Sequence, residues 1–127
     1  MRGQAGAEGV PRDIKVRTFD FAVRIVRLCQ HLDDTPGVGR TLGKQLLRAG
    51  TSVGANVEEA QAGQSKADFI SKYAIALKEA RETHYWLRLL VAGDLVAEAR
   101  IGDLLNEANE IMRVIGAIIV SAKKGQQ

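Results

Sequence analysis

Residues 66–92 read KADFISKYAIALKEARETHYWLRLLVA, and apolar or small side chains recur in them at steps of three and four residues. This spacing puts those side chains along one side of an α-helix, where they can form the seam of a helical bundle. The predicted seam consists of Phe69, Tyr73, Ala76, Ala80, Thr83, Leu87 and Leu90. A neighbouring row with Ile75, Trp86 and Leu89 is also partly apolar, so we expect this helix to be covered on more than one side.

Helix-breaking residues stand on both sides of this segment. Gly63-Gln64-Ser65 precedes it, and Ser65 with Asp68 resembles a capping box that marks a helix start. Gly93-Asp94 follows it and favours a turn. A fourth helix is predicted from residue 96 or 97 to residue 122. Its seam consists of Ile101, Leu105, Ala108, Met112, Ile115 and Ile119, with Leu104, Ile111 and Ile118 alongside.

The second helix is predicted at residues 38–62, again with heptad spacing. Its seam consists of Leu42, Leu46, Ala49, Val53, Asn56 and Ala60. The segment also contains four glycines, each of which costs up to about 1 kcal/mol relative to alanine inside a helix. We expect close approach of a neighbouring backbone to compensate; the alternative is a kink near residues 50–52. The buried amide of Asn56 needs a hydrogen-bond partner, which we expect on a neighbouring helix.

The first helix is predicted from Asp13 to about Leu32, before the stop signal Asp33-Asp34-Thr35-Pro36-Gly37. Its apolar row is expected to be Ile14, Phe19, Val23, Val26 and either Cys29 or Gln30. Residues 1–12 lack apolar periodicity and are interpreted as a flexible tail outside a domain spanning residues 13–124. Four helices with short connections predict an all-α, antiparallel up-down-up-down four-helix bundle.

The composition is typical of one soluble domain, because 127 residues with 46% apolar side chains can bury a single core. The lone Cys29 cannot form an internal disulfide, which indicates a reducing compartment. The sequence contains neither a signal peptide nor a span of about 18 apolar residues, so we expect a cytoplasmic protein without membrane contact. A net charge of +3 and a pI near 9.2 permit binding to nucleic acid without requiring it.

The histidines do not indicate a metal centre. A dimetal bundle needs Glu-x-x-His motifs, whereas Leu28 precedes His31 and Arg81 precedes His84 at that spacing. We therefore predict no metal, cofactor or small-molecule substrate. Arg24 and His31 are loosely similar to the motif of dimeric helical ribonucleases, but a surface arginine and a capping histidine are the favoured interpretation.

The charged residues suggest two further hypotheses, one of catalysis by carboxylates and one of nucleic-acid binding by basic residues. Glu79 and Glu82 lie one turn apart, which suits acid–base chemistry, but no nucleophile accompanies them. Pairing with Arg48 or Arg81 between helices is favoured instead, so no catalytic residue is predicted. Basic residues with an interleaved aromatic could contact phosphates and stack on a base; they are Arg40, Lys44, Lys78, Arg81, Tyr85 and Arg88. The alternative interpretation is that these basic residues form an ordinary solvent-exposed face.

Residues 45–60, QLLRAGTSVGANVEEA, resemble the signature of the bacterial four-helix bundle family named for the 23S rRNA intervening-sequence protein. Phe69-Ile70, Ile75-Ala76, residues 78–83 and residues 85–87 continue the likeness, which extends from about Phe19 into the fourth helix. The resemblance implies an up-and-down bundle that assembles into a homopentameric ring without established enzymatic activity. The family is also similar to the accessory protein of diversity-generating retroelements, a basic pentamer that associates with a reverse transcriptase and nucleic acid.

The resemblance also suggests a structural polar network. Positions that match the family's recurrent polar residues are Arg48, Ser52, Asn56, Glu59 and Glu82, and we add Glu79 to this set. The chain departs from the family pattern at Leu47, where a second arginine is common, and at residues 58–60. Both departures lower the local positive charge and argue against nucleic-acid binding.

The apolar sides of the third and fourth helices are broader than one core requires, which predicts an oligomer interface at Trp86, Leu89, Ile111 and Ile118. The leading functional hypothesis is a non-enzymatic, self-assembling bundle, a pentamer, that serves as scaffold or adaptor. The alternative is an RNA- or DNA-binding accessory protein that uses the basic faces of the oligomer.

Overall fold

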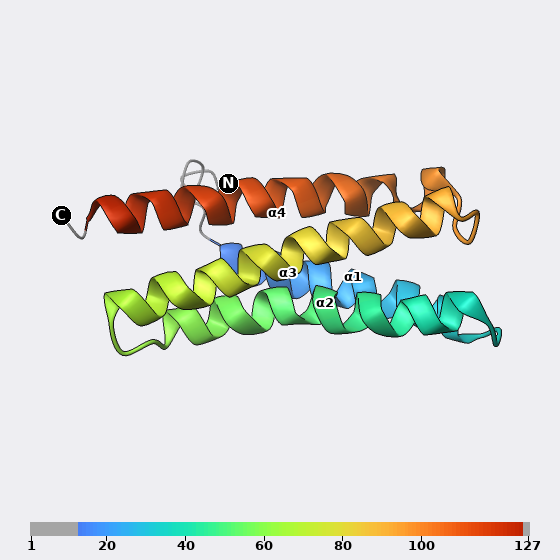
Figure 1. The fold of residues 1–127 in the computed structure, drawn as a ribbon, viewed down its shortest axis with the longest axis horizontal. Coiled ribbons are helices and arrows are strands. Elements are labelled where there is room, and N and C mark those ends of the chain that lie inside the picture. The colour runs from blue at the N-terminus through green and yellow to red at the C-terminus, as the bar shows by residue number, and fades with distance from the viewer. Residues whose placement is uncertain (1–12, 126–127) are drawn as a thin grey trace, which may run out of the picture.

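The computed structural model describes residues 13–125, and four helices account for nearly all of them. They are α1 (Ile14–Asp33), α2 (Val38–Gln61), α3 (Lys66–Ala92) and α4 (Glu98–Lys124). Each helix runs antiparallel to the next (Figure 1), so the predicted all-α four-helix bundle is confirmed. The predicted tail at residues 1–12 lies outside the described residues. No helix within residues 13–125 is long and apolar enough to cross a membrane.

The helix ends lie close to the predicted positions, for identifiable local reasons. Gly37 has φ = 133°, a conformation that suits glycine, and it stands directly before α2. The Ser65 hydroxyl accepts a hydrogen bond from the backbone N–H of Asp68 at 3.0 Å, as the capping-box pattern predicted for the start of α3. Asp94 has φ = 61° in the turn between α3 and α4.

Helices that follow one another in the sequence make most of the packing, and α1 with α4 is the least extensively packed of the four neighbouring pairs. The largest fully buried side chains come from all four helices; they include Phe21, Ile25, Leu46, Val53, Tyr73, Leu87, Leu90, Ile101, Ile111 and Ile115. Figure 1 shows α3 and α4 close together at their connecting turn and farther apart where α3 begins and α4 ends. The bundle is therefore more open at that end.

Two glycines of α2 allow α1 to approach closely. A Cβ atom at Gly50 would lie 2.8 Å from Cγ2 of Ile25, and one at Gly54 would lie 3.3 Å from the backbone carbonyl of Thr18. Real side chains do not tolerate the first of these distances. The expectation that glycines in α2 permit close helix packing is thus correct at Gly50 and Gly54, and α2 remains one helix through residues 50–52.

The expected core face of α1 is correct at its ends, where Ile14 and Cys29 are buried, but wrong at its centre. Phe19 is 59% exposed and Val26 is 38% exposed, whereas Phe21 is 1% exposed and packs in the core. The buried row is Ile14, Thr18, Phe21, Ile25, Leu28, Cys29 and Leu32. Both rows of α1 have helical spacing. The row that becomes buried is the one that packs against the glycines of α2.

Candidate interaction surfaces

Polar side chains link α2 to α3 through one arginine. Arg48 on α2 donates to Oε1 of Glu79 at 3.4 Å and to the carboxylate of Glu82, both on α3. The indole Nε1 of Trp86 donates to Oε2 of Glu82 at 3.0 Å. Glu79 is buried, so its charge is accompanied by a partner as buried carboxylates require. This arrangement pairs the carboxylates of α3 with Arg48 of α2 and so holds the two helices together.

The other predicted members of the polar network do not join it. The Ser52 hydroxyl donates to the Arg48 carbonyl at 2.7 Å, and the Asn56 amide donates to the Ser52 carbonyl at 2.9 Å, both within α2. The expectation that Asn56 bonds to a neighbouring helix is therefore wrong, because its own helix supplies the acceptor. Glu59 is exposed near the end of α2 and makes no ion pair among residues 13–125.

The structure places the predicted basic residues in two different settings. On α2, Arg40 bonds both to the Asp33 carbonyl and to its carboxylate, and Arg48 is held by α3, which leaves Lys44 exposed between them. The row on α2 is thus largely neutralised.

On α3, one exposed stripe remains positive, and we call it the α3 basic stripe: Lys78, Arg81, Tyr85 and Arg88. None of its three cations forms an ion pair within residues 13–125. The Arg88 guanidinium carbon lies 5.7 Å from the centre of the Tyr85 ring, within cation–π range. Burial and then the charge of Arg88 lower the pKa of the neighbouring His84.

The predicted interface residues differ in exposure. Trp86, Leu89 and Ile118 are half-buried, so part of each remains at the surface of the subunit. Ile111 is 1% exposed and packs in the subunit's own core. The assignment of Ile111 to an interface is therefore wrong, because α4 turns this side chain toward the core.

An apolar ridge runs along the outside of α1. It consists of Val16, Phe19, Val23 and Val26, at steps of three, four and three residues. Val16 is 52% exposed and Val23 is half-buried, and none of the four side chains belongs to the buried core formed within residues 13–125. The sequence analysis placed most of these residues in the core, although the presence of two apolar rows on one helix was a visible sign of a second surface.

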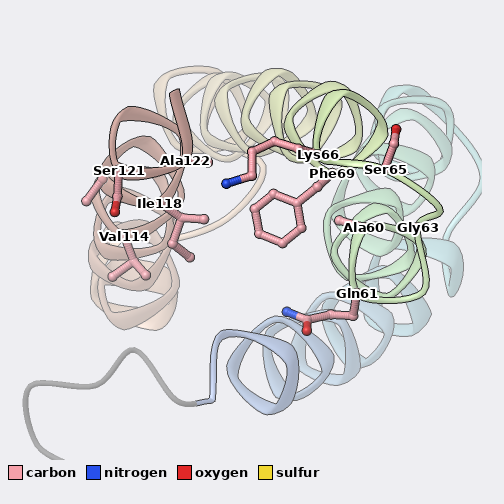
Figure 2. A pocket seen from close by; sticks show the side chains of 11 residues that line it. Ala60, Gln61, Gly63, Ser65, Lys66, Phe69, Val114, Ile118, Ser121 and Ala122 are labelled. Atoms are coloured by element: carbon pink, nitrogen blue, oxygen red, sulfur yellow. The ribbon is translucent and has the colours of Figure 1, made fainter. Parts of the chain in front are cut away.

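An apolar groove of about 930 Å³ lies at the open end of the bundle. Figure 2 shows Phe69 and Lys66 of α3 reaching into this opening, with Val114 and Ile118 of α4 across from them and Gln61 of α2 beside it. Small side chains complete the lining; they are Ala60, Gly63, Ser65, Ala117, Ser121 and Ala122.

The remaining chemistry-bearing side chains of residues 13–125 form neither a cluster of metal ligands nor an exposed thiol. No group of three or more His, Cys, Asp or Glu residues within residues 13–125 could hold a metal ion. Cys29 is buried and its thiol donates to the Gly43 carbonyl at 3.3 Å. Burial raises the pKa of the Cys29 thiol to about 11, which keeps it protonated and unreactive at neutral pH.

Arg24 and His31 of α1 do lie on one side of their helix, as their seven-residue spacing predicted. They border a hollow of about 240 Å³ between α1 and the first turns of α4, together with Arg27 and Arg100. Its floor is apolar and consists of Leu28, Ile101 and Leu104. The hollow contains no carboxylate or hydroxyl in its lining, so the ribonuclease likeness gains no further catalytic group.

Comparison with known proteins agrees with this fold. Residues 12–117 match the family described as the 23S rRNA-intervening sequence protein, and the chain belongs to this family. A solved structure from Bacteroides thetaiotaomicron, described as a protein of unknown function from the S23 ribosomal protein family, is 44% identical. The similarity covers 84% of this chain and 97% of that chain, with a TM-score of 0.78. No curated protein matches the sequence.

Proposed function

We propose that this chain is a non-catalytic, self-assembling subunit that serves as scaffold or adaptor. Copies would join by docking the apolar ridge of one subunit into the apolar groove of the next. The observation that supports this proposal is the exposure of Phe19, at 59%, within a row that the subunit's own core does not use. A contiguous exposed apolar surface of this kind is typical of protein interfaces.

The spacing of the apolar ridge suits another helix. Steps of three, four and three residues are those of a coiled-coil seam, in which each side chain inserts between residues of the facing helix. Phe19 and Val23 are the central members of the row. Burial of such side chains stabilises an assembly by about 1.5–3 kcal/mol each before the cost of ordering is counted.

The apolar groove offers a complementary receptor. Its walls are mostly apolar, and Lys66 contributes a cation that makes no ion pair within residues 13–125. Asp20, next to Phe19, is an exposed anion that is likewise unpaired in that part of the chain. Docking of ridge into groove would therefore bring opposite charges toward each other at an apolar contact, which favours the correct register.

The ridge and the groove lie on different faces. Helical periodicity places the ridge away from Arg17, whose side chain contacts α4. An interface between two different surfaces is heterologous, and copies joined in this way form a closed ring or an open filament. The pentamer suggested by the sequence is one such ring.

Mass measurement in solution tests the self-assembly. Sedimentation or native mass spectrometry at micromolar concentration should give a multiple of the 13.8 kDa chain mass. A strict monomer would overturn the proposed function. The variant Phe19→Asp should reduce assembly strongly, whereas Tyr85→Asp, which changes another exposed aromatic residue, should not. Loss of assembly with Tyr85→Asp instead would move the interface to the outer side of α3, beside Trp86 and Leu89.

A mixing experiment tests the ridge-and-groove contact itself. Phe19→Asp removes the ridge and leaves the groove, while Ala117→Glu charges the groove and leaves the ridge. Each variant alone should be monomeric, but a mixture should give a 1:1 heterodimer, because one intact ridge meets one intact groove. If the wild type assembles and the mixture remains monomeric, self-assembly stands and this interface is wrong.

A second candidate function is nucleic-acid binding along the α3 basic stripe. Its three cations, which form no ion pair within residues 13–125, share one exposed face with Tyr85, which could contact phosphates and stack on a base. The family description and the name of the Bacteroides relative refer to ribosomal RNA and to a ribosomal protein, and these names support the candidate.

Salt dependence tests this second candidate. Affinity for single-stranded RNA should fall steeply between low and physiological salt if phosphates are contacted. The variant Lys78→Gln with Arg81→Gln should weaken binding, whereas Lys44→Gln, on α2, should change it little. Absence of binding at low salt would exclude the function.

A further inference from the structure

The hollow between α1 and α4 brings together three of the five arginines that form no ion pair within residues 13–125. Arg24, Arg27 and Arg100 border it, and none of them forms an ion pair within residues 13–125. In that part of the chain, four other arginines are each held by a carboxylate; they are Arg17, Arg40, Arg48 and Arg113. The three arginines of the hollow therefore remain available to a ligand.

The carboxylates nearest in sequence do not neutralise these arginines. Asp20 lies one turn before Arg24 on α1, and Asp103 lies one turn after Arg100 on α4, yet both are exposed and neither makes an ion pair in the described part of the chain. Like charges held around one depression repel one another, and this repulsion is relieved when an anion enters. A bound anion would thus also stabilise the junction between α1 and α4.

The side chains that line the hollow determine which kind of anion it can bind. Guanidinium groups present several N–H donors in a plane and bind phosphate oxygens in pairs, which ammonium groups cannot do. His31, in the last turn of α1, adds a ring nitrogen at the border. The apolar floor of Leu28, Ile101 and Leu104 offers no acceptor that would compete for the arginine donors.

The size of the hollow limits the ligand. Its volume of about 240 Å³ lies below the roughly 300–1,000 Å³ of sites that enclose drug-sized molecules. We infer that this hollow is a binding site for a phosphate group, held between Arg24 and Arg27 of α1 and Arg100 of α4. The group comes either from a small phosphate compound or from a nucleic-acid backbone whose remainder stays outside. The site shares α1 with the apolar ridge, because Arg24 and Arg27 directly follow Val23 and Val26, but none of its lining residues belongs to the ridge, the apolar groove or the α3 basic stripe.

Titration with inorganic pyrophosphate at constant ionic strength tests the inference. The full chain should bind pyrophosphate and unfold at a higher temperature in its presence. The double variant Arg24→Gln, Arg100→Gln should weaken binding by at least about tenfold, because charge-assisted hydrogen bonds are the strong class. The matched control Arg81→Gln, Arg88→Gln removes the same charge from the α3 basic stripe and should leave the binding unchanged.

Two outcomes overturn the inference: no binding of pyrophosphate, or an equal loss in both double variants, which would show a general charge effect. A competition arm identifies the source of the phosphate. If an oligonucleotide displaces pyrophosphate from the wild type, the site takes a backbone phosphate; if it does not, the site takes the small compound. Because both variants keep the ridge and the groove, their assembly is measured in parallel, and loss of phosphate binding is separable from loss of assembly.

Discussion

The guanidinium of Arg17 on α1 donates two hydrogen bonds to the carboxylate of Glu107 on α4, from Nε at 2.7 Å and from Nη2 at 2.9 Å. These residues join the first helix to the last, which form the least extensively packed of the four neighbouring pairs of helices. The hydrogen bonds to Glu107 raise the pKa of Arg17, although partial burial opposes this effect. The contact therefore closes the fourth side of the bundle.

We expect this pair to contribute measurably to stability. A double-mutant cycle with Arg17→Gln and Glu107→Gln should give a coupling of about 1 kcal/mol, because the pair is bidentate and partly shielded from water. Chemical denaturation measures the four free energies of unfolding. The exposed pair Arg113 and Glu110, on α4 alone, is the control and should give a coupling near zero. Equal couplings in the two cycles would contradict the role assigned to Arg17.

Substitution of glycine by alanine should have opposite effects at two helical positions. Gly50→Ala should destabilise the fold by about 1–3 kcal/mol, since the added methyl group meets the Ile25 side chain. Gly102→Ala should stabilise it by about 0.5–1 kcal/mol, because a Cβ atom there meets nothing within 4 Å and alanine favours the helix. Thermal and urea denaturation measure both changes. A stabilising Gly50→Ala would disprove the close approach of α1 to α2.

Two phenylalanines of α1, two positions apart, provide a test of the helix orientation. Phe21→Ala should destabilise the subunit by about 3–5 kcal/mol, because it leaves a cavity in the core. Phe19→Ala should change the unfolding free energy of the monomer by no more than about 0.5 kcal/mol, as is usual for exposed positions. Denaturation at concentrations low enough to keep the protein monomeric makes the comparison. A larger loss of stability in Phe19→Ala than in Phe21→Ala would show that the core face expected from the sequence is correct.

The Cys29 thiol should be protected, and the protection should depend on pH. Since burial raises its pKa to about 11, thiol reagents should label it slowly in the native state at neutral pH and rapidly after unfolding. The unfolded chain releases this proton at lower pH than the folded chain. The free energy of unfolding should therefore fall as pH rises from about 9 toward 11. Cys29→Ala should remove this part of the pH dependence, and rapid native labelling would contradict the burial.

The extents of the helices were predictable because strong local signals mark their ends. The stop around Pro36-Gly37 and the capping Ser65 act through neighbouring residues alone. The orientation of α1 was not predictable in this way, since Phe19 and Phe21 each belong to an apolar row with helical spacing. Only the fit of Ile25 against Gly50, on another helix, selects between these rows.

Some contacts of the candidate sites could likewise be predicted from the sequence, and others could not. Pairing of Arg48 with Glu79 and Glu82 could be anticipated, because long apolar seams bring α2 and α3 together. The partnership of Arg17 with Glu107 spans 90 positions of sequence and carries no local signal. The hollow with Arg24 and Arg100 likewise depends on the junction of the first and last helices. Ile111 was assigned to the surface because sequence periodicity alone does not fix the rotation of α4.

The weak side between α1 and α4 also determines how the bundle should open. Because α1 and α4 pack against each other less than the other neighbouring helices do, they can separate while the packing of α2 against α3 persists. Transient opening of this kind exposes backbone amides of α4 to solvent, while those in the middle of α3 stay protected. Amide hydrogens in the final turns of α4 should therefore exchange with deuterium well before those near Ala76 and Ala80 at the middle of α3.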